Sequence, residues 1–217
     1  MKPPSSFRAL PHLYAILDVD LLAARSLNLP SFAAELRDAG INLLQYRNKQ
    51  GTPRAMLNDA AMLKDSLAGE NLKLIFNDRV DLALLAGFEG VHVGQEDLSA
   101  EDARSILGNQ RWVGVSTHTR EQVIEADRTS CDYIAYGPIF STASKNNPDP
   151  TVGLAGLRTA RTFTQKPLVA IGGITRENCR AVLDAGADSI AVISGLLPAS
   201  GSETPRQIAE EFLALLG

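Results

Sequence analysis

Two stretches near the end of the chain, PLVAIGG at residues 167–173 and SIAVIS at residues 189–194, decide the fold. Each is a nearly continuous apolar run, which is typical of a parallel strand covered on both faces. The segment between them carries a helical pattern that ends at Gly186, and Gly commonly ends helices. The two stretches therefore predict a strand–helix–strand unit.

The same alternation continues back to the N-terminus. Strands are predicted at 13–18, 41–47, 73–77, 90–94, 111–117, 133–139, 167–173 and 189–194. Helix starts are predicted at four hydroxyl N-caps, Thr52, Ser99, Thr119 and Thr204. Gly40 and Gly87 predict helix ends. Eight strand–helix units within 217 residues predict one (β/α)₈ barrel domain, residues 1–217. A doubly wound open sheet is the alternative, because strand count alone does not prove closure.

Composition excludes several classes of protein. The chain is 45% apolar with a net charge of −4, and it has no Lys/Arg run, which argues against a nucleic-acid or membrane-surface binder. No apolar stretch approaches the roughly 18 residues of a spanning helix, and the first ten residues do not resemble a secretion signal. We therefore expect a cytoplasmic protein. Cys131 and Cys179 are predicted to be packed thiols.

Polar residues gather where the predicted strands end, which is where parallel α/β folds bind ligands. Gln45, Arg47 and Lys49 alternate along the second strand end, so they project to one side. Two cations and an amide at a barrel mouth suit a ligand rich in anionic oxygens. The alternative is ordinary surface charge at a solvated strand end.

Asp78 and Asp97 follow neighbouring strands and could share a Mg²⁺ ion, which favours a few carboxylates together with substrate phosphates. Asn77 is expected to hold a ligand or a carboxylate in place. Two structural alternatives remain for Asp78, namely an ion pair with Arg79 and an N-cap for the helix that follows.

The last two strands indicate a phosphate site. Gly172-Gly173 and Ser194-Gly195 allow close approach of main-chain N–H groups, although two tight turns would explain them equally well. His118, at a strand end, is a candidate general acid or base. His92 lies within a strand and is interpreted as a core histidine.

Taken together, seven segments resemble the thiamin-phosphate synthase family across nearly the whole chain. They are QYRNK, FNDRVDLAL, GVHVGQEDL, GVSTHT, YGPIFSTASK, AIGGIT and AVISGL, in order at successive strand ends. The resemblance implies a (β/α)₈ barrel that takes small-molecule substrates, a hydroxymethylpyrimidine diphosphate and a thiazole phosphate, together with Mg²⁺.

The resemblance also implies roles for individual residues. Gln45, Arg47, Lys49 and Asn77 would bind the pyrimidine diphosphate, and Asp78 and Asp97 would ligate Mg²⁺. Ser116 would contact the pyrimidine and Lys145 the diphosphate. The thiazole phosphate would be held by Thr142, Ser144 and the main chain at Gly173, Ile193 and Ser194. Arg47, Lys49, Ser116 and Lys145 would be the catalytic residues.

The implied reaction is a dissociative substitution that releases diphosphate, with loss of CO₂ where the thiazole is a carboxylate. Catalysis would come from positioning and charge stabilisation. Two alternatives remain: a thiazole tautomerase of the same fold that uses His118, and a barrel that binds a phosphorylated metabolite without turnover. Asn77, Asp78, Asp97 and Lys145 argue against the tautomerase.

Two positions depart from the pattern of the family. Asn48 stands where relatives often have an acidic residue, and on an extended segment its side chain should point away from Arg47 and Lys49. Ser144 stands where Thr is frequent, which keeps the hydroxyl. The polar loop at residues 140–152 is long enough to be functional. The oligomeric state, a homo-oligomer included, is left open by the sequence.

Overall fold

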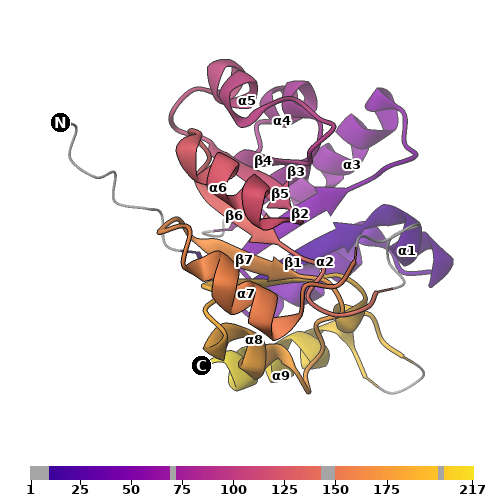
Figure 1. Ribbon diagram of the computed structural model, residues 1–217. Coiled ribbons are helices and arrows are strands. Elements are labelled where there is room, and N and C mark those ends of the chain that lie inside the picture. Colours follow the sequence, from indigo (N-terminus) through magenta and orange to yellow (C-terminus); the bar gives the residue numbers. More distant parts are fainter. Residues whose placement is uncertain (1–9, 69–71, 143–149, 200–202) are drawn as a thin grey trace.

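The computed structural model describes residues 10–68, 72–142, 150–199 and 203–217 (Figure 1). The strands form a closed barrel of parallel neighbours in the order β1 to β8. Their bounds are β1 Leu13–Asp18, β2 Leu43–Arg47, β3 Lys73–Asn77, β4 Gly90–Val93, β5 Trp112–Thr117, β6 Tyr133–Tyr136, β7 Leu168–Ile171 and β8 Ser189–Val192. Pairing of Leu13 with Ile190 and of Ala15 with Val192 joins the first strand to the last, which excludes the open sheet.

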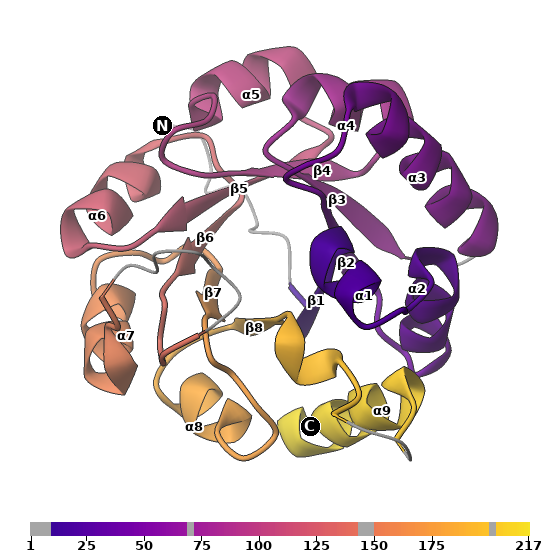
Figure 2. The same ribbon diagram turned by 90° about the vertical axis from the view of Figure 1, so that its right-hand side faces the viewer.

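Helices surround the strands in a ring when the barrel is viewed along its axis (Figure 2). The helices are α1 Val19–Ala24, α2 Leu29–Asp38, α3 Pro53–Ser66, α4 Val80–Ala86, α5 Ala100–Leu107, α6 Arg120–Arg128, α7 Gly153–Arg161, α8 Cys179–Asp184 and α9 Pro205–Leu216, with a 3₁₀ turn, η1, at Ser194–Leu196. Each strand is followed by helical structure before the next strand begins, which confirms the (β/α)₈ architecture.

The predicted helix caps are present. Thr52 and Ser99 accept hydrogen bonds from the main-chain N–H three residues ahead, at 3.3 and 3.1 Å. Thr119 and Thr204 each form a complete capping box with a Gln at the third helical position. Gly87 ends α4 in the left-handed conformation, with φ of 67°. Local sequence therefore sets these helix boundaries.

Several predicted strands extend too far at their carboxyl ends. The expected strand at 133–139 ends at Tyr136, because Pro138 has no N–H to continue the ladder. The expected strand at 167–173 ends at Ile171, because Gly172 turns the chain with φ of 103°. The expected strand at 189–194 ends at Val192, before η1. These corrections place the residues beyond each strand in loops at the barrel mouth.

Apolar side chains form two separate layers. One lies between the strands and the helices, and the other fills the barrel interior with Tyr14, Ile16, Trp112, Tyr133 and other side chains from the inward-facing strand positions. The two cysteines, predicted to be packed thiols, are buried and unbridged. Within the described residues, no helix is long and apolar enough to cross a membrane.

Candidate active site

A cavity of about 580 Å³ opens at the carboxyl ends of the strands. This volume lies within the usual range for small-molecule sites. Most of the predicted site residues line it together, namely Gln45, Arg47, Lys49, Asn77, Asp78, Asp97, Ser116, Thr142, Gly173, Ile193 and Ser194. Ser144 and Lys145 lie outside the described residues. Side chains that are far apart in the sequence are therefore gathered at one end of the barrel.

The cations on β2 are held by carboxylates from neighbouring strands. Arg47 donates to the buried carboxylate of Asp18, the last residue of β1, and the ladder pairs these two residues directly. Lys49 pairs with Asp78 beyond β3. Each cation is thus oriented before a ligand binds, which lowers the cost of ordering a long side chain.

Asp18 belongs to the site although the sequence did not single it out. One carboxylate oxygen accepts from the main-chain N–H of Leu21 at 3.0 Å and so caps α1, while the other faces Arg47. Its position as the final residue of the first predicted strand was the available signal. Asn48 behaves as expected: its side chain bonds to Tyr46 and Gly51, away from the cavity.

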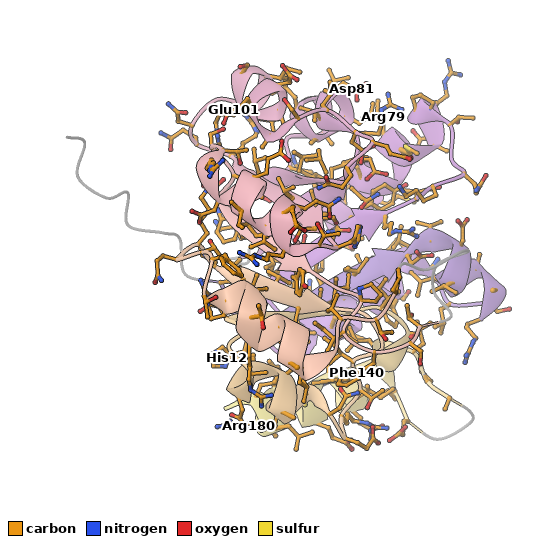
Figure 3. The ribbon with its side chains drawn as sticks, in the orientation of Figure 1. His12, Arg79, Asp81, Glu101, Phe140 and Arg180 are labelled. Carbon is orange, nitrogen blue, oxygen red and sulfur yellow. The ribbon has the colours of Figure 1, made fainter. Side chains whose placement is uncertain are left out.

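The structure excludes both structural alternatives that the sequence left for Asp78. Arg79 forms its ion pair with Asp81 instead, at 2.6 and 2.9 Å, on the surface of α4 (Figure 3). Helix α4 has no side-chain N-cap. Asp78 itself adopts a left-handed backbone, with φ of 62°, which is uncommon for a residue other than Gly. This turn places its carboxylate among the cavity-lining residues.

Asp97 lines the same part of the cavity as Asp78. Its carboxylate accepts from the main-chain N–H of Gly94 at 2.7 Å. Burial raises the pKa of Asp97 above its usual value, and the neighbouring Asp78 acts in the same direction. A bound cation would stabilise the charged form of Asp97 in this position.

The side-chain Nδ2 of Asn77 is buried at the cavity without a hydrogen-bond partner, and such groups normally have one. Because an amide N–H donates, this group fits an acceptor oxygen of a ligand. Among the residues that the structure describes, no cluster of three His, Cys, Asp or Glu side chains is arranged to hold a metal. Asp78 and Asp97 provide two carboxylates, and Mg²⁺ is commonly bound by one or two carboxylates together with ligand phosphates.

A chain of hydrogen-bonded polar groups crosses the barrel, and all its members except Tyr133 line the cavity. Gln45 bonds to Tyr14 at 2.8 Å, Tyr14 to Tyr133 at 3.1 Å, Tyr133 to His92 at 3.0 Å, and His92 to Ser116 at 2.8 Å. Burial lowers the pKa of His92 to about 4, so its imidazole is neutral near pH 7. His92 is therefore the buried, hydrogen-bonded histidine that the sequence predicts, although it also lines the cavity.

His118 lines the cavity from the end of β5. Its Nδ1 lies 2.7 Å from the carbonyl oxygen of Gly137, which can only accept, so this nitrogen carries the hydrogen. Its main-chain N–H donates to Gln122 at 2.7 Å, which ties the residue to the capping box of α6. His118 is thus held by α6 and by the segment that follows β6.

The loop after β7 is shaped for close approach of a ligand. Gly172 and Gly173 both have positive φ, and a Cβ on Gly173 would lie 2.5 Å from the carbonyl oxygen of Ser141. Asn178 fixes this loop by accepting from Thr175 N–H at 2.9 Å and donating to the Gly173 carbonyl at 3.0 Å. The glycines are required by the backbone here and also line the cavity.

A second hollow, of about 530 Å³, lies at the opposite end of the barrel beside His12 and Arg180. Figure 3 shows these two residues at the end away from Phe140, which follows β6. The charged residues of this second hollow include Arg180 and Asp184, which form an exposed ion pair at 3.4 Å. The inward-facing cations, carboxylates and hydroxyls converge at the mouth instead, which makes the mouth the candidate active site.

Comparison with known proteins identifies the family. The profile of the family described as thiamine monophosphate synthase matches residues 13–196, which span all eight strands and the cavity. The chain belongs to this family. A thiamine-phosphate synthase of Koribacter versatilis is 56% identical over 95% of this chain and 96% of its own length. One from Chlorobium phaeovibrioides is 40% identical over 94% and 93%.

A solved structure extends the similarity to three dimensions. The thiamine phosphate pyrophosphorylase of Pyrococcus furiosus superposes with a TM-score of 0.82 at 31% identity, covering 94% of both chains. Membership of the thiamine monophosphate synthase family and the closed barrel predicted from the sequence are thereby confirmed.

Proposed function

We propose that this chain, as a single domain over residues 1–217, is a thiamine-phosphate synthase. It would join a hydroxymethylpyrimidine diphosphate to a thiazole phosphate and release diphosphate. The observation that carries the proposal is the set of Arg47, Lys49, Asp78 and Asp97 around one cavity in a chain of this family. Both charge signs are needed, because a diphosphate requires cations and its metal requires carboxylates.

The reaction breaks the bond between the pyrimidine methylene carbon and the diphosphate oxygen, and the electron pair leaves with diphosphate. The thiazole nitrogen then donates its lone pair to that carbon. Where the thiazole is a carboxylate, CO₂ is lost. Arg47 and Lys49 stabilise the charge that develops on the departing group, and a pair of unit charges 4 Å apart interacts by roughly 4 kcal/mol at an effective dielectric near 20.

Mg²⁺, held by Asp78 and Asp97, would supply charge neutralisation at the diphosphate. The side chains of this chain do the remaining work. Gln45 and Asn77 bind the pyrimidine diphosphate, and the buried Nδ2 of Asn77 gains in the ligand the acceptor that it lacks. Ser116 orients the pyrimidine ring. Preorganised donors of this kind act without rearranging during the reaction.

The second substrate would occupy the other side of the mouth. Thr142, with the main chain at Gly173, Ile193 and Ser194, would hold the thiazole phosphate. From the sequence, Ser144 would join this set and Lys145 would contact the diphosphate. The thiazole nitrogen and the pyrimidine methylene group would then share one cavity, which would convert an encounter of two molecules into a reaction between oriented neighbours.

The test is turnover by the purified chain with pyrimidine diphosphate, thiazole phosphate and Mg²⁺. We expect thiamin phosphate and diphosphate in equal amounts. Arg47→Ala should lower kcat/KM by about 10²–10³, the effect of removing one preorganised donor. Arg79→Ala is the matched control, because that arginine pairs on the surface with Asp81. Folded protein without product, or Mg²⁺-independent interconversion of thiazole tautomers, would overturn the proposal.

A further inference from the structure

Packing of the barrel interior does not by itself explain the hydrogen-bonded chain of polar groups from Gln45 to Ser116. Tyr14 and Tyr133 are completely buried in its interior, with their ring centroids 6.0 Å apart in an edge-to-face arrangement. A Phe at either position would fill nearly the same volume. A buried hydroxyl is costly unless it is bonded, so its presence indicates a polar task.

The barrel makes room for this chain at a definite place. Gly114 on β5 lies directly beside Tyr133 on β6, and a Cβ on Gly114 would lie 2.0 Å from Cζ of the tyrosine ring. The imidazole of His92 stacks on the same ring, with centroids 5.5 Å apart and planes 27° apart. The hydroxyl of Tyr133 is therefore fixed between its two partners by packing from several sides.

Two orders of hydrogens are compatible with the bonds along this chain. The side-chain N–H of Gln45 donates to the hydroxyl of Tyr14, and either tyrosine hydroxyl can donate to the other. In one of the two orders, Tyr14 donates to Tyr133, and Tyr133 donates to Nδ1 of His92. A neutral imidazole that accepts at Nδ1 carries its hydrogen on Nε2.

The last link of the chain is Ser116, which lines the cavity, as do Gln45, Tyr14 and His92. In this order of hydrogens, Nε2–H of His92 donates to Oγ of Ser116. With one lone pair of Oγ occupied by His92, the hydroxyl hydrogen of Ser116 is available to the ligand. Reversing any bond in the chain would turn Ser116 from a donor to the ligand into an acceptor.

We propose that Tyr133 and His92 are positioning residues that hold Ser116 as a hydrogen-bond donor to an acceptor atom of the bound ligand. If the proposed function holds, on which this identification rests, that acceptor is a ring nitrogen of the pyrimidine. The hydrogen-bonded series from Gln45 to Ser116 thereby selects a heteroaromatic ring that presents a lone pair to Ser116, and it disfavours a ring that presents N–H there.

The first experiment compares Tyr133→Phe with Tyr46→Phe. Tyr46 is a matched control, because it is also a fully buried tyrosine, but its hydroxyl bonds to Asp59 and Asn48 outside the cavity. We expect Tyr133→Phe to raise KM for the pyrimidine substrate and lower kcat/KM by about tenfold, the effect of one hydrogen bond at the upper end of its usual range. Tyr46→Phe should leave both constants within about twofold.

A double-mutant cycle separates positioning from general destabilisation. In a Ser116→Ala background, the hydroxyl through which Tyr133 acts is gone, so adding Tyr133→Phe should change kcat/KM by less than about twofold. An undiminished tenfold loss in that background would show that Tyr133 does not act through Ser116, and would overturn the proposal.

Nitrogen-15 NMR of the unliganded protein tests the order of hydrogens directly, whether or not the chain is a synthase. We expect His92 to carry its hydrogen on Nε2, and to lose this preference in Tyr133→Phe. A hydrogen on Nδ1 in the unchanged protein would overturn the proposal. Loss of the proposed function is recognised separately, as absent turnover with the Nε2–H form of His92 intact.

Discussion

Replacing Gly114 by Ala is predicted to disturb both stability and activity through one side chain. The new methyl group would lie 2.0 Å from Cζ and 2.4 Å from Oη of Tyr133, whereas non-bonded carbons approach to about 3.5 Å. The ring would have to move by roughly 1.5 Å. Its hydroxyl would then leave hydrogen-bonding range of Tyr14 and His92, which lie 3.1 and 3.0 Å away.

The size of the effect follows from these two consequences. Overpacking costs about 1–3 kcal/mol, and losing two hydrogen bonds adds roughly 1 kcal/mol each. We expect the free energy of unfolding to fall by about 3–5 kcal/mol, which for a domain of this size lowers Tm by about 6–20 °C. Thermal unfolding followed by circular dichroism measures this, and the synthase assay measures the accompanying loss of kcat/KM.

A matched background shows whether Tyr133 is the cause. In Tyr133→Leu the ring that clashes is absent, so adding Gly114→Ala should lower Tm by no more than about 3 °C. A Tm for Gly114→Ala alone within 2 °C of the unchanged protein would refute the reasoning, as would an equal loss in both backgrounds.

Three further changes probe the site and its electrostatics. Asp18→Asn keeps an acceptor for the α1 cap but removes the charge that orients Arg47, so KM for the diphosphate substrate should rise about tenfold with α1 intact; an unchanged KM would show that Arg47 is positioned without it. Asp78→Ala should raise the Mg²⁺ concentration for half-maximal rate at least about tenfold, and an unshifted Mg²⁺ titration would remove Asp78 from the metal site. The pKa of His92 is about 4 in the folded chain against 6.5 ordinarily, so between these pH values the unfolded chain binds a proton that the folded chain does not. Its contribution to stability should therefore fall by about 1.4 kcal/mol per unit as the pH drops from 6.5 to 4, and denaturant titrations of His92→Gln should show a shallower dependence on pH than the unchanged protein.

Local signals were sufficient to predict the alternation of strands and helices. Apolar runs such as residues 168–171 and hydroxyl caps such as Thr119 act within a few residues of themselves, so they can be interpreted without knowledge of the tertiary structure. Closure of the barrel could not be predicted from local signals, because it depends on the pairing of β1 with β8, which are separated by almost the whole chain. Strand ends were overestimated where an apolar run continued past a backbone break, as at Pro138 and Gly172.

The sequence predicted where the site residues lie more fully than it predicted which residues they contact. Residues at strand ends converge in any parallel barrel, so Arg47, Asp78 and Asp97 could be placed together from their spacing alone. The partner of Arg47 could not, because Asp18 lies 29 residues away and meets it only through the β1–β2 register.

The tyrosines of the buried chain show the same limit. Tyr14 and Tyr133 occupy apolar strand positions, where an aromatic residue ordinarily serves only packing. The role of their hydroxyl groups depends on hydrogen-bond partners on other strands, and these partners come close only when the barrel closes.

The central claim is that a Mg²⁺-bound diphosphate lies at the barrel mouth between the cations of β2 and the carboxylates of Asp78 and Asp97. A crystal structure of the chain with Mg²⁺, diphosphate and thiamin phosphate tests it directly. We predict a metal ion about 2.1 Å from oxygens of both carboxylates and of diphosphate, with Arg47 and Lys49 against the same diphosphate. Diphosphate bound elsewhere, or a metal ion that neither carboxylate touches, would contradict the account.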